Sequence, residues 1–222
     1  MTLARWKDLC IDAADPSVLA AFWAVALDLQ ATLGDDGDAV LRGPTPEQTV
    51  WMNRVPEPKV VKHRVHLDLV RPPLASLLAA GAAVLQEVSY GERSWTVLSD
   101  PEGGELCLFA QPDAPSGLVI DSRDPVADAA WWAEALGARA AVAPGGLRRW
   151  VCDVPGLPFD VVKLVGVDEP KTVKNRVHWD LVSDDVPGFV ARGARVLRTP
   201  DDEVRWHVLA DPAGNEFCVF AP

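Results

Sequence analysis

The chain contains the same sequence twice. Residues 55–70 read VPEPKVVKHRVHLDLV and residues 167–182 read VDEPKTVKNRVHWDLV, with 12 of 16 positions identical at an offset of 112. Residues 95–109 (WTVLSDPEGGELCLF) return as residues 206–220 (WHVLADPAGNEFCVF). Self-similarity at a fixed period is the mark of a duplicated structural unit. We therefore expect two copies of one fold of about 110 residues, whose equivalent positions can be compared one by one.

Each copy divides again into two modules of one strand, one helix and three strands. Near the start, Leu9 and Ile11 alternate with polar residues and predict a half-buried strand. Asp15 and Pro16 then supply a helix cap and a first helical residue, and in the second copy Asp124 and Pro125 do the same for a helix that ends at Gly137. Further strands of this module are expected at 31–33, 39–42 and 49–55.

The pattern restarts at residue 64. Val65, Leu67 and Leu69 face one side of a strand, and the alternating polar residues, His66 among them, face the other. A short helix that ends at Gly81 follows. Further strands are expected at 83–88, 95–98 and 105–109.

The predicted fold class is α+β, with four βαβββ modules paired into two cups. The polar, Pro-containing stretch 111–117 is predicted to link the two copies. This places one domain at 1–112 (modules 1–62 and 63–112) and the other at 113–222 (modules 113–174 and 175–222).

The amino-acid composition and net charge indicate which kinds of molecule the protein could bind. With 49% hydrophobic and 24% charged residues, the 222-residue chain is typical of a globular protein. The net charge of −11 argues against nucleic acid, which needs a basic surface. The longest apolar run, Leu19–Leu27, is too short to cross a membrane, and the first residues lack the apolar stretch of a secretory signal. We expect a cytoplasmic monomer or homodimer that binds a small molecule.

The motifs resemble those of the vicinal oxygen chelate superfamily, which includes glyoxalase I, fosfomycin- and bleomycin-resistance proteins and extradiol dioxygenases. The cues are the paired modules, the RVHLDLV or RVHWDLV strand that opens each second module, and the DPxGxExCxF strand that closes it. The closest resemblance is to tandem glyoxalase-like domain proteins, and it extends over essentially the whole chain. Because this fold hosts isomerases, lyases, dioxygenases and inert binders, function must be argued from the site.

The resemblance implies a metal site in the first half. Metal-dependent members take their ligands from the first and last strands of paired modules. Carried over, these positions offer Asp8, His66 and either Glu105 or Cys107 to one divalent Zn, Ni, Fe or Mn ion. His66 and Glu105 would then be the catalytic pair. The second half has Gly117 in place of Asp8 and is expected to hold no metal.

Other polar-face residues are predicted to line a ligand pocket, although a simpler structural interpretation stays open for each. The histidines can pair with the carboxylates two residues on, the cysteines can act as small buried hydrophobes, and the glutamates can stabilise the adjacent turn. The predicted ligand-binding residues are Arg64, Asp68, Trp51, Asn53, Cys107, His178, Asp180, Cys218 and Glu216. Trp179 is predicted to point away from this face into the core.

Two functions are compatible with these residues. The first is a glyoxalase-like small-molecule-binding protein that acts as a metal-assisted lyase or isomerase on an apolar or aromatic metabolite. The second is a metal-free sequestering protein of the kind that confers bleomycin resistance. The glyoxalase I reaction itself is not expected, because its four-ligand set is incomplete in both halves.

Overall fold

The computed structural model describes residues 2–143, 145–146 and 148–222, and it confirms an α+β fold of four βαβββ modules. The first module comprises β1 (Arg5–Ala13), α1 (Pro16–Leu27), β2 (Gln30–Leu33), β3 (Ala39–Arg42), η1 (Pro46–Gln48) and β4 (Val50–Arg54). The second comprises β5 (Val65–Leu69), α2 (Leu74–Ala79), β6 (Ala83–Tyr90), β7 (Arg93–Ser99) and β8 (Glu105–Phe109). The third comprises β9 (Gly117–Ser122), α3 (Pro125–Leu136), β10 (Arg139–Val142), β11 (Arg148–Cys152) and β12 (Val161–Gly166). The fourth comprises β13 (Val177–Val182), α4 (Val186–Ala191), β14 (Arg195–Arg198), β15 (His207–Ala210) and β16 (Glu216–Phe220).

The two long helices begin where the sequence predicts. The side chain of Asp15 accepts hydrogen bonds from the N–H groups at the start of α1, and Asp124 does the same for α3. Gly137 ends α3 in the left-handed conformation, with φ of 62°, which glycine adopts without strain. Among the described residues, no helix is long and apolar enough to cross a membrane.

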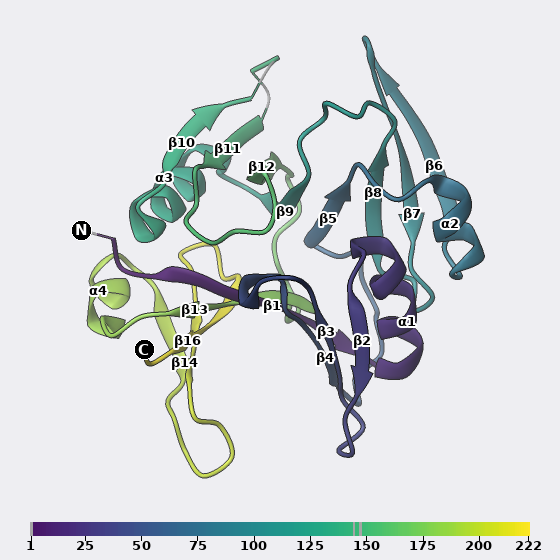
Figure 1. Ribbon diagram of the computed structural model, residues 1–222. Coiled ribbons are helices and arrows are strands. Elements are labelled where there is room, and N and C mark those ends of the chain that lie inside the picture. The colour runs from purple at the N-terminus through teal and green to yellow at the C-terminus, as the bar shows by residue number, and fades with distance from the viewer. Residues whose placement is uncertain (1, 144, 147) are drawn as a thin grey trace.

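The strands form two eight-stranded sheets, and each sheet joins the two halves of the chain. Sheet A has the order β14-β15-β16-β13-β1-β4-β3-β2, and sheet B has the order β10-β11-β12-β9-β5-β8-β7-β6. Antiparallel pairing of β1 with β13 unites the first and fourth modules, and pairing of β5 with β9 unites the second and third. Figure 1 shows sheet A in the lower half of the molecule and sheet B in the upper half. The predicted metal site assumed that the two modules of the first half pair with each other. This assumption is wrong, because each module pairs with one from the other half.

The core lies between the sheets, where the helices pack. In Figure 1, α3 and α4 flank the sheets on one side, and α1 and α2 on the other. Trp132 on α3 packs edge-on against Trp179 of β13, with ring centroids 5.0 Å apart, and against Phe217 of β16 at 5.2 Å. Its indole N–H donates a hydrogen bond to Asp211. The prediction that Trp179 is a core residue is confirmed, since it is 2% exposed.

Trp132 should be a main stabilising contact of sheet A. We expect Trp132→Ala to lower the free energy of unfolding by about 3–5 kcal/mol, because it leaves a large cavity and an unpaired Asp211. Val126→Ala on the same helix is the control, since Val126 is exposed and should cost little. Urea unfolding followed by circular dichroism measures both, and equal losses would contradict this account of the core.

Candidate functional site

Two clusters of polar side chains lie on the sheet faces opposite the core. We define the acidic cup as the cluster of Asp8, Cys10, His178, Asp180 and Cys218 on sheet A. We define the basic cup as the cluster of His66, Asp68, Cys107 and Lys163 on sheet B. Each cup thus takes residues from both halves of the chain.

The predicted metal set of Asp8, His66 and Glu105 is not brought together. Asp8 lies on β1 of sheet A, opposite Asp180. His66 and Glu105 lie on β5 and β8 of sheet B. The first half does bring three donor residues together, but these are His66, Asp68 and Cys107 on sheet B, without Asp8.

The acidic cup is built around two facing carboxylates. Asp8 and Asp180 are register partners on β1 and β13 and are 4% and 3% exposed. Asp8 accepts hydrogen bonds from the indole N–H of Trp51, at 3.1 Å, and from Lys7, at 2.5 Å. The thiol of Cys10 lies 3.6 Å from Asp180 and donates to it.

The two carboxyl groups of the acidic cup, Asp8 and Asp180, do not both ionise readily, because they are buried close together. Burial, followed by the charge of Asp8, raises the pKa of Asp180 to about 8. Burial also lowers the pKa of His178 and raises that of the Cys10 thiol, so both are neutral at pH 7. Within the described chain, Asp8 Oδ1, Asp180 Oδ1 and His178 Nδ1 are buried without a hydrogen-bond partner. Such a site favours a proton or a cation.

The donor set of the acidic cup fits a divalent metal. Ligand atoms of Cys10, His178 and Asp180 all lie within 4.8 Å of one another, and the carboxylate of Asp8 faces Asp180. Sulfur, imidazole and carboxylate together suit Zn and related transition metals. The unpartnered oxygen and nitrogen atoms are the groups that a cation would satisfy.

The basic cup has the same three donor types but already contains a cation. His66, Asp68 and Cys107 are grouped as closely as their counterparts in the acidic cup. However, the ammonium group of Lys163 donates to Asp68 at 2.8 Å and to the carbonyl of Pro115 at 2.6 Å. Although burial alone would raise the pKa of Asp68, hydrogen bonding with His66 and the charge of Lys163 hold it below its usual value.

Gly117 makes room for this lysine. A Cβ atom at position 117 would lie 2.8 Å from Cε of Lys163 and 2.9 Å from the carbonyl oxygen of Val161. Gly117 is the counterpart of Asp8, and Lys163 is the counterpart of Trp51. The two replacements therefore belong together, and they substitute an ammonium group for one carboxylate.

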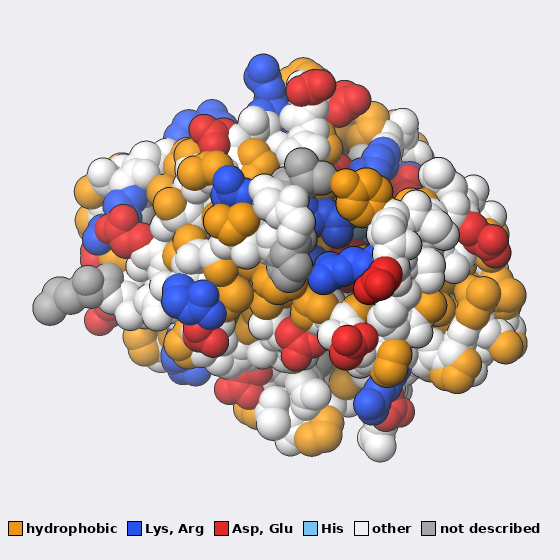
Figure 2. Space-filling view, turned by 90° about the horizontal axis from the view of Figure 1, so that it is seen from above, with side chains coloured by type: hydrophobic (Ala, Val, Ile, Leu, Met, Phe, Trp, Pro, Cys, Tyr) orange, Lys and Arg blue, Asp and Glu red, His pale blue; other side chains and the backbone are white. Residues whose placement is uncertain are grey.

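Aromatic and basic side chains form the walls of the basic cup. Trp95 stacks on Phe109 with centroids 5.5 Å apart, Arg148 lies 5.6 Å above the ring of Trp95, and Lys163 lies 5.0 Å from the ring of Phe109. The indole N–H of Trp150 is buried and has no acceptor in the described residues. Figure 2 looks onto the sheet B end of the molecule, where Lys and Arg side chains gather near the middle of the face between hydrophobic ones.

Glu105 and Glu216 anchor the connections between modules. Glu105 pairs with Lys59 at 2.9 Å and accepts from the backbone N–H of His63. Glu216 makes the equivalent contacts with Lys171 and Asn175. These contacts give both glutamates a structural role, but the role is to hold the connections and differs from the expected stabilisation of the adjacent turn. A catalytic role for Glu105 stays a prediction.

The structure also locates the predicted ligand-binding residues Arg64 and Asn53. Arg64 donates to the backbone carbonyls of Asp121 and Glu169. Asn53 lies on β4 opposite Asp12, two residues beyond Trp51 and therefore on the same face of the sheet. Sequence reasoning missed Cys10, although its alternation with Leu9 and Ile11 places it on the face of Asp8.

Comparison with known proteins identifies the family. The family described as "Glyoxalase-like domain" matches residues 8–109 and again 117–220, so the chain belongs to this family as a tandem pair. Glyoxalase I from Zea mays is similar in structure, with a TM-score of 0.67 and 15% identity over 97% of this chain and 92% of that one. A putative dioxygenase from Bacillus subtilis has a TM-score of 0.67 and 12% identity over 99% and 86%. At these identities the likeness shows the fold alone. None of the curated proteins matches the sequence.

Lys163 should control the stability of the basic cup in a pH-dependent way. In the wild type the pKa of Asp68 lies below its usual value, so this carboxylate stabilises the fold at neutral pH and loses that effect as the pH falls through its folded-state pKa. Lys163→Met leaves the buried Asp68 without its ammonium partner and with only the imidazole of His66 beside it, which should cost about 3–5 kcal/mol at pH 7. Without Lys163 the pKa of Asp68 should lie above its usual value. The variant's loss of stability relative to the wild type should then become smaller as the pH falls, because Asp68 is protonated in the folded state.

Unfolding measured at pH 7 and pH 5 tests this prediction. The double variant Lys163→Met/Asp68→Asn should recover most of the loss, because no unpaired charge remains. Lys62→Met is the matched control, since Lys62 is mostly exposed and its pair with Asp121 should contribute about 1 kcal/mol or less. A deficit in Lys163→Met that does not change with pH would contradict the assignment.

Proposed function

We propose that this chain is a small-molecule-binding protein whose acidic cup holds one divalent cation and supports lyase or isomerase chemistry on an apolar or aromatic metabolite. The observation that carries the proposal is the facing pair Asp8 and Asp180, buried beside His178 with unpartnered oxygen atoms. The only ammonium group that contacts this pair in the described chain is that of Lys7, whose side chain is 30% exposed. In the basic cup, by contrast, the buried ammonium group of Lys163 neutralises the equivalent carboxylate, Asp68.

Each residue of the acidic cup has a defined part in this proposal. Asp8, His178 and Asp180, with Cys10, would hold the cation, which when bound would polarise a carbonyl or enolate oxygen of the substrate. Trp51 fixes the orientation of Asp8 through its indole N–H. Because the pKa of Asp180 is about 8, this carboxyl keeps a proton at pH 7 and would release it when a cation binds.

Aromatic side chains support an apolar or aromatic substrate. Trp206 stacks on Phe220 with centroids 4.9 Å apart, and the ammonium group of Lys7 lies 4.2 Å from the Phe220 ring. Trp51 adds an indole ring on the same face of the sheet. Flat aromatic walls beside a few polar groups are typical of small-molecule sites.

Metal content of the purified, untagged protein tests the proposal. We expect about one equivalent of Zn, Ni, Fe or Mn per chain after incubation with each ion. His178→Ala should abolish it, and Asp8→Gly, which copies the residue found at position 117, should lower it strongly. His66→Ala is the matched control in the basic cup and should keep the metal. Elemental analysis by mass spectrometry gives the stoichiometry.

The control decides which cup is involved. Metal lost in His66→Ala but kept in His178→Ala would move the site to the basic cup and overturn the proposal. A wild-type protein that binds none of the four ions would also overturn it.

The basic cup favours a second candidate function, metal-free sequestration of a ligand. The cation of Arg148 and the stacked Trp95 and Phe109 suit an aromatic anion. We expect 2-naphthoate to quench tryptophan fluorescence in the wild type. In Arg148→Met, which removes the cation above Trp95, the affinity for 2-naphthoate should fall at least about tenfold. Unchanged quenching would exclude the basic cup as the site.

A further inference from the structure

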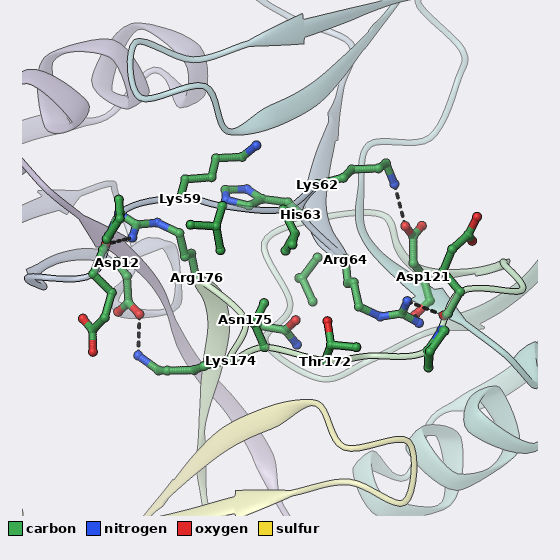
Figure 3. A pocket seen from close by; sticks show the side chains of 18 of the residues that line it. Asp12, Lys59, Lys62, His63, Arg64, Asp121, Thr172, Lys174, Asn175 and Arg176 are labelled. Atoms are coloured by element: carbon green, nitrogen blue, oxygen red, sulfur yellow. Dashed lines mark hydrogen bonds and ion pairs between the residues drawn. The ribbon is translucent and has the colours of Figure 1, made fainter.

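A large cavity lies between the two connections that join the modules, and its lining includes none of the donor residues that define the two cups. Its volume is about 810 Å³, within the range of ligand pockets. The repeated segments 55–65 and 167–176 supply nearly all of its lining, together with Asp12 and Asp121 at the ends of β1 and β9. Figure 3 shows these connections facing each other across the cavity, with charged side chains at both ends.

The wall between the charged ends contains aliphatic side chains beside the polar ones of Thr172 and Asn175. Val60, Val61 and Val173 line the cavity and remain 71%, 42% and 40% exposed. Pro58 and Pro170 occupy equivalent positions in the two connections. No Phe, Tyr or Trp side chain is among the lining residues that the structure describes. Exposed aliphatic side chains gathered around a cavity indicate a binding site for an aliphatic group.

The two ends of the cavity are built alike. Arg64 donates to the carbonyl of Glu169, and its counterpart Arg176 donates to the carbonyl of Glu57. The backbone N–H groups of Asp121 and Asp12 donate in turn to the carbonyls of Arg64 and Arg176. The duplication therefore places one guanidinium group at each end of the cavity.

A single replacement leaves these two arginines with different charge environments. Arg176 pairs with the carboxylate of Glu102 at 3.2 Å. The counterpart of Glu102 in the second copy is Ala213. Arg64 accordingly forms no ion pair among the described residues, although its charge acts on the buried carboxylate of Asp128, and its buried Nε has no acceptor.

The other cations of the lining are already neutralised. Lys59 pairs with Glu105, Lys62 with Asp121, and Lys174 with Asp12. Arg64 is therefore the one Lys or Arg side chain of this cavity that forms no direct ion pair in the described part of the chain.

A second replacement lies next to Arg64 in the sequence. Asn175 donates a hydrogen bond to Asn215, but the counterparts of this pair are His63 and Gly104. The Nε2 atom of His63 is buried without a partner in the described residues. Burial lowers the pKa of His63 to about 4, so the ring is neutral at pH 7 and adds no competing charge.

We infer that the cavity is a binding site for an aliphatic carboxylate, with the carboxylate group at Arg64 and the hydrocarbon chain between the valines of the two connections. The guanidinium group of Arg64 lacks the acid that its counterpart has, and a ligand carboxylate would supply it. This inference goes beyond the proposed function, because the site shares no donor with the acidic or basic cup.

The reciprocal exchange of Glu102 and Ala213 tests the inference. Decanoate binding to the full chain is measured by isothermal titration calorimetry at pH 7, with 1-decanol as the uncharged control ligand. We expect one decanoate per chain and weaker binding of 1-decanol. Ala213→Glu gives Arg64 the acid that Arg176 has and should weaken decanoate at least about tenfold without changing 1-decanol. Ala213 is exposed in a turn, so the variant should fold.

Two further variants separate this site from others. Glu102→Ala frees Arg176 and should retain or strengthen decanoate binding. Lys163→Met/Asp68→Asn removes the buried charges of the basic cup and should leave it unchanged. Three results would overturn the inference: no binding by the wild type, full affinity in Ala213→Glu, or loss in the Lys163→Met/Asp68→Asn variant alone. Metal content is independent of each of them.

Discussion

The antiparallel pairing of β1 with β13, and of β5 with β9, is the constraint on which the rest of the structure depends. These two ladders join modules that come from different halves of the chain. Because β4 and β5 belong to different sheets, the segment between them must cross from sheet A to sheet B. The segment between β12 and β13 must cross in the opposite direction for the same reason. The two cups and the cavity between the crossing segments are therefore consequences of one pairing choice.

The same pairing explains how a duplicated chain comes to have two unlike sites. Equivalent residues occupy opposite sheets, so each cup combines an opening module of one copy with a closing module of the other. The closing modules contribute the same residue types, His66, Asp68 and Cys107 or His178, Asp180 and Cys218. The difference comes from the opening modules, where Asp8 and Trp51 correspond to Gly117 and Lys163. The change from carboxylate to glycine admits the lysine, and the lysine neutralises the remaining carboxylate.

Local patterns in the sequence were sufficient to predict the modules but not their partners. Alternation placed His66 and Asp68 on one face of a strand, and Asp15-Pro16 and Asp124-Pro125 marked the helix starts. The helix-facing position of Trp179 followed from the same alternation. Which strand lies beside β1, however, depends on contacts between residues that are about 170 positions apart, such as Cys10 and Asp180. No local pattern records that choice, so the sequence placed Asp8 with His66 instead of with His178.

The crossing connections show which positions the fold needs and which are free to serve a ligand. The contacts that hold the connections in place occur twice: Glu105 and Glu216 with their lysines, and the two arginines with opposite carbonyl groups. The side chains of His63 and Ala213, which differ between the copies, take no part in these shared contacts, although the backbone N–H of His63 donates to Glu105. A carboxylate opposite Arg64 is therefore unnecessary for the path of the backbone, because the chain adopts the same path without it. Its absence leaves a half-buried positive charge at a cavity wall, and such a charge is costly unless water or a ligand compensates it.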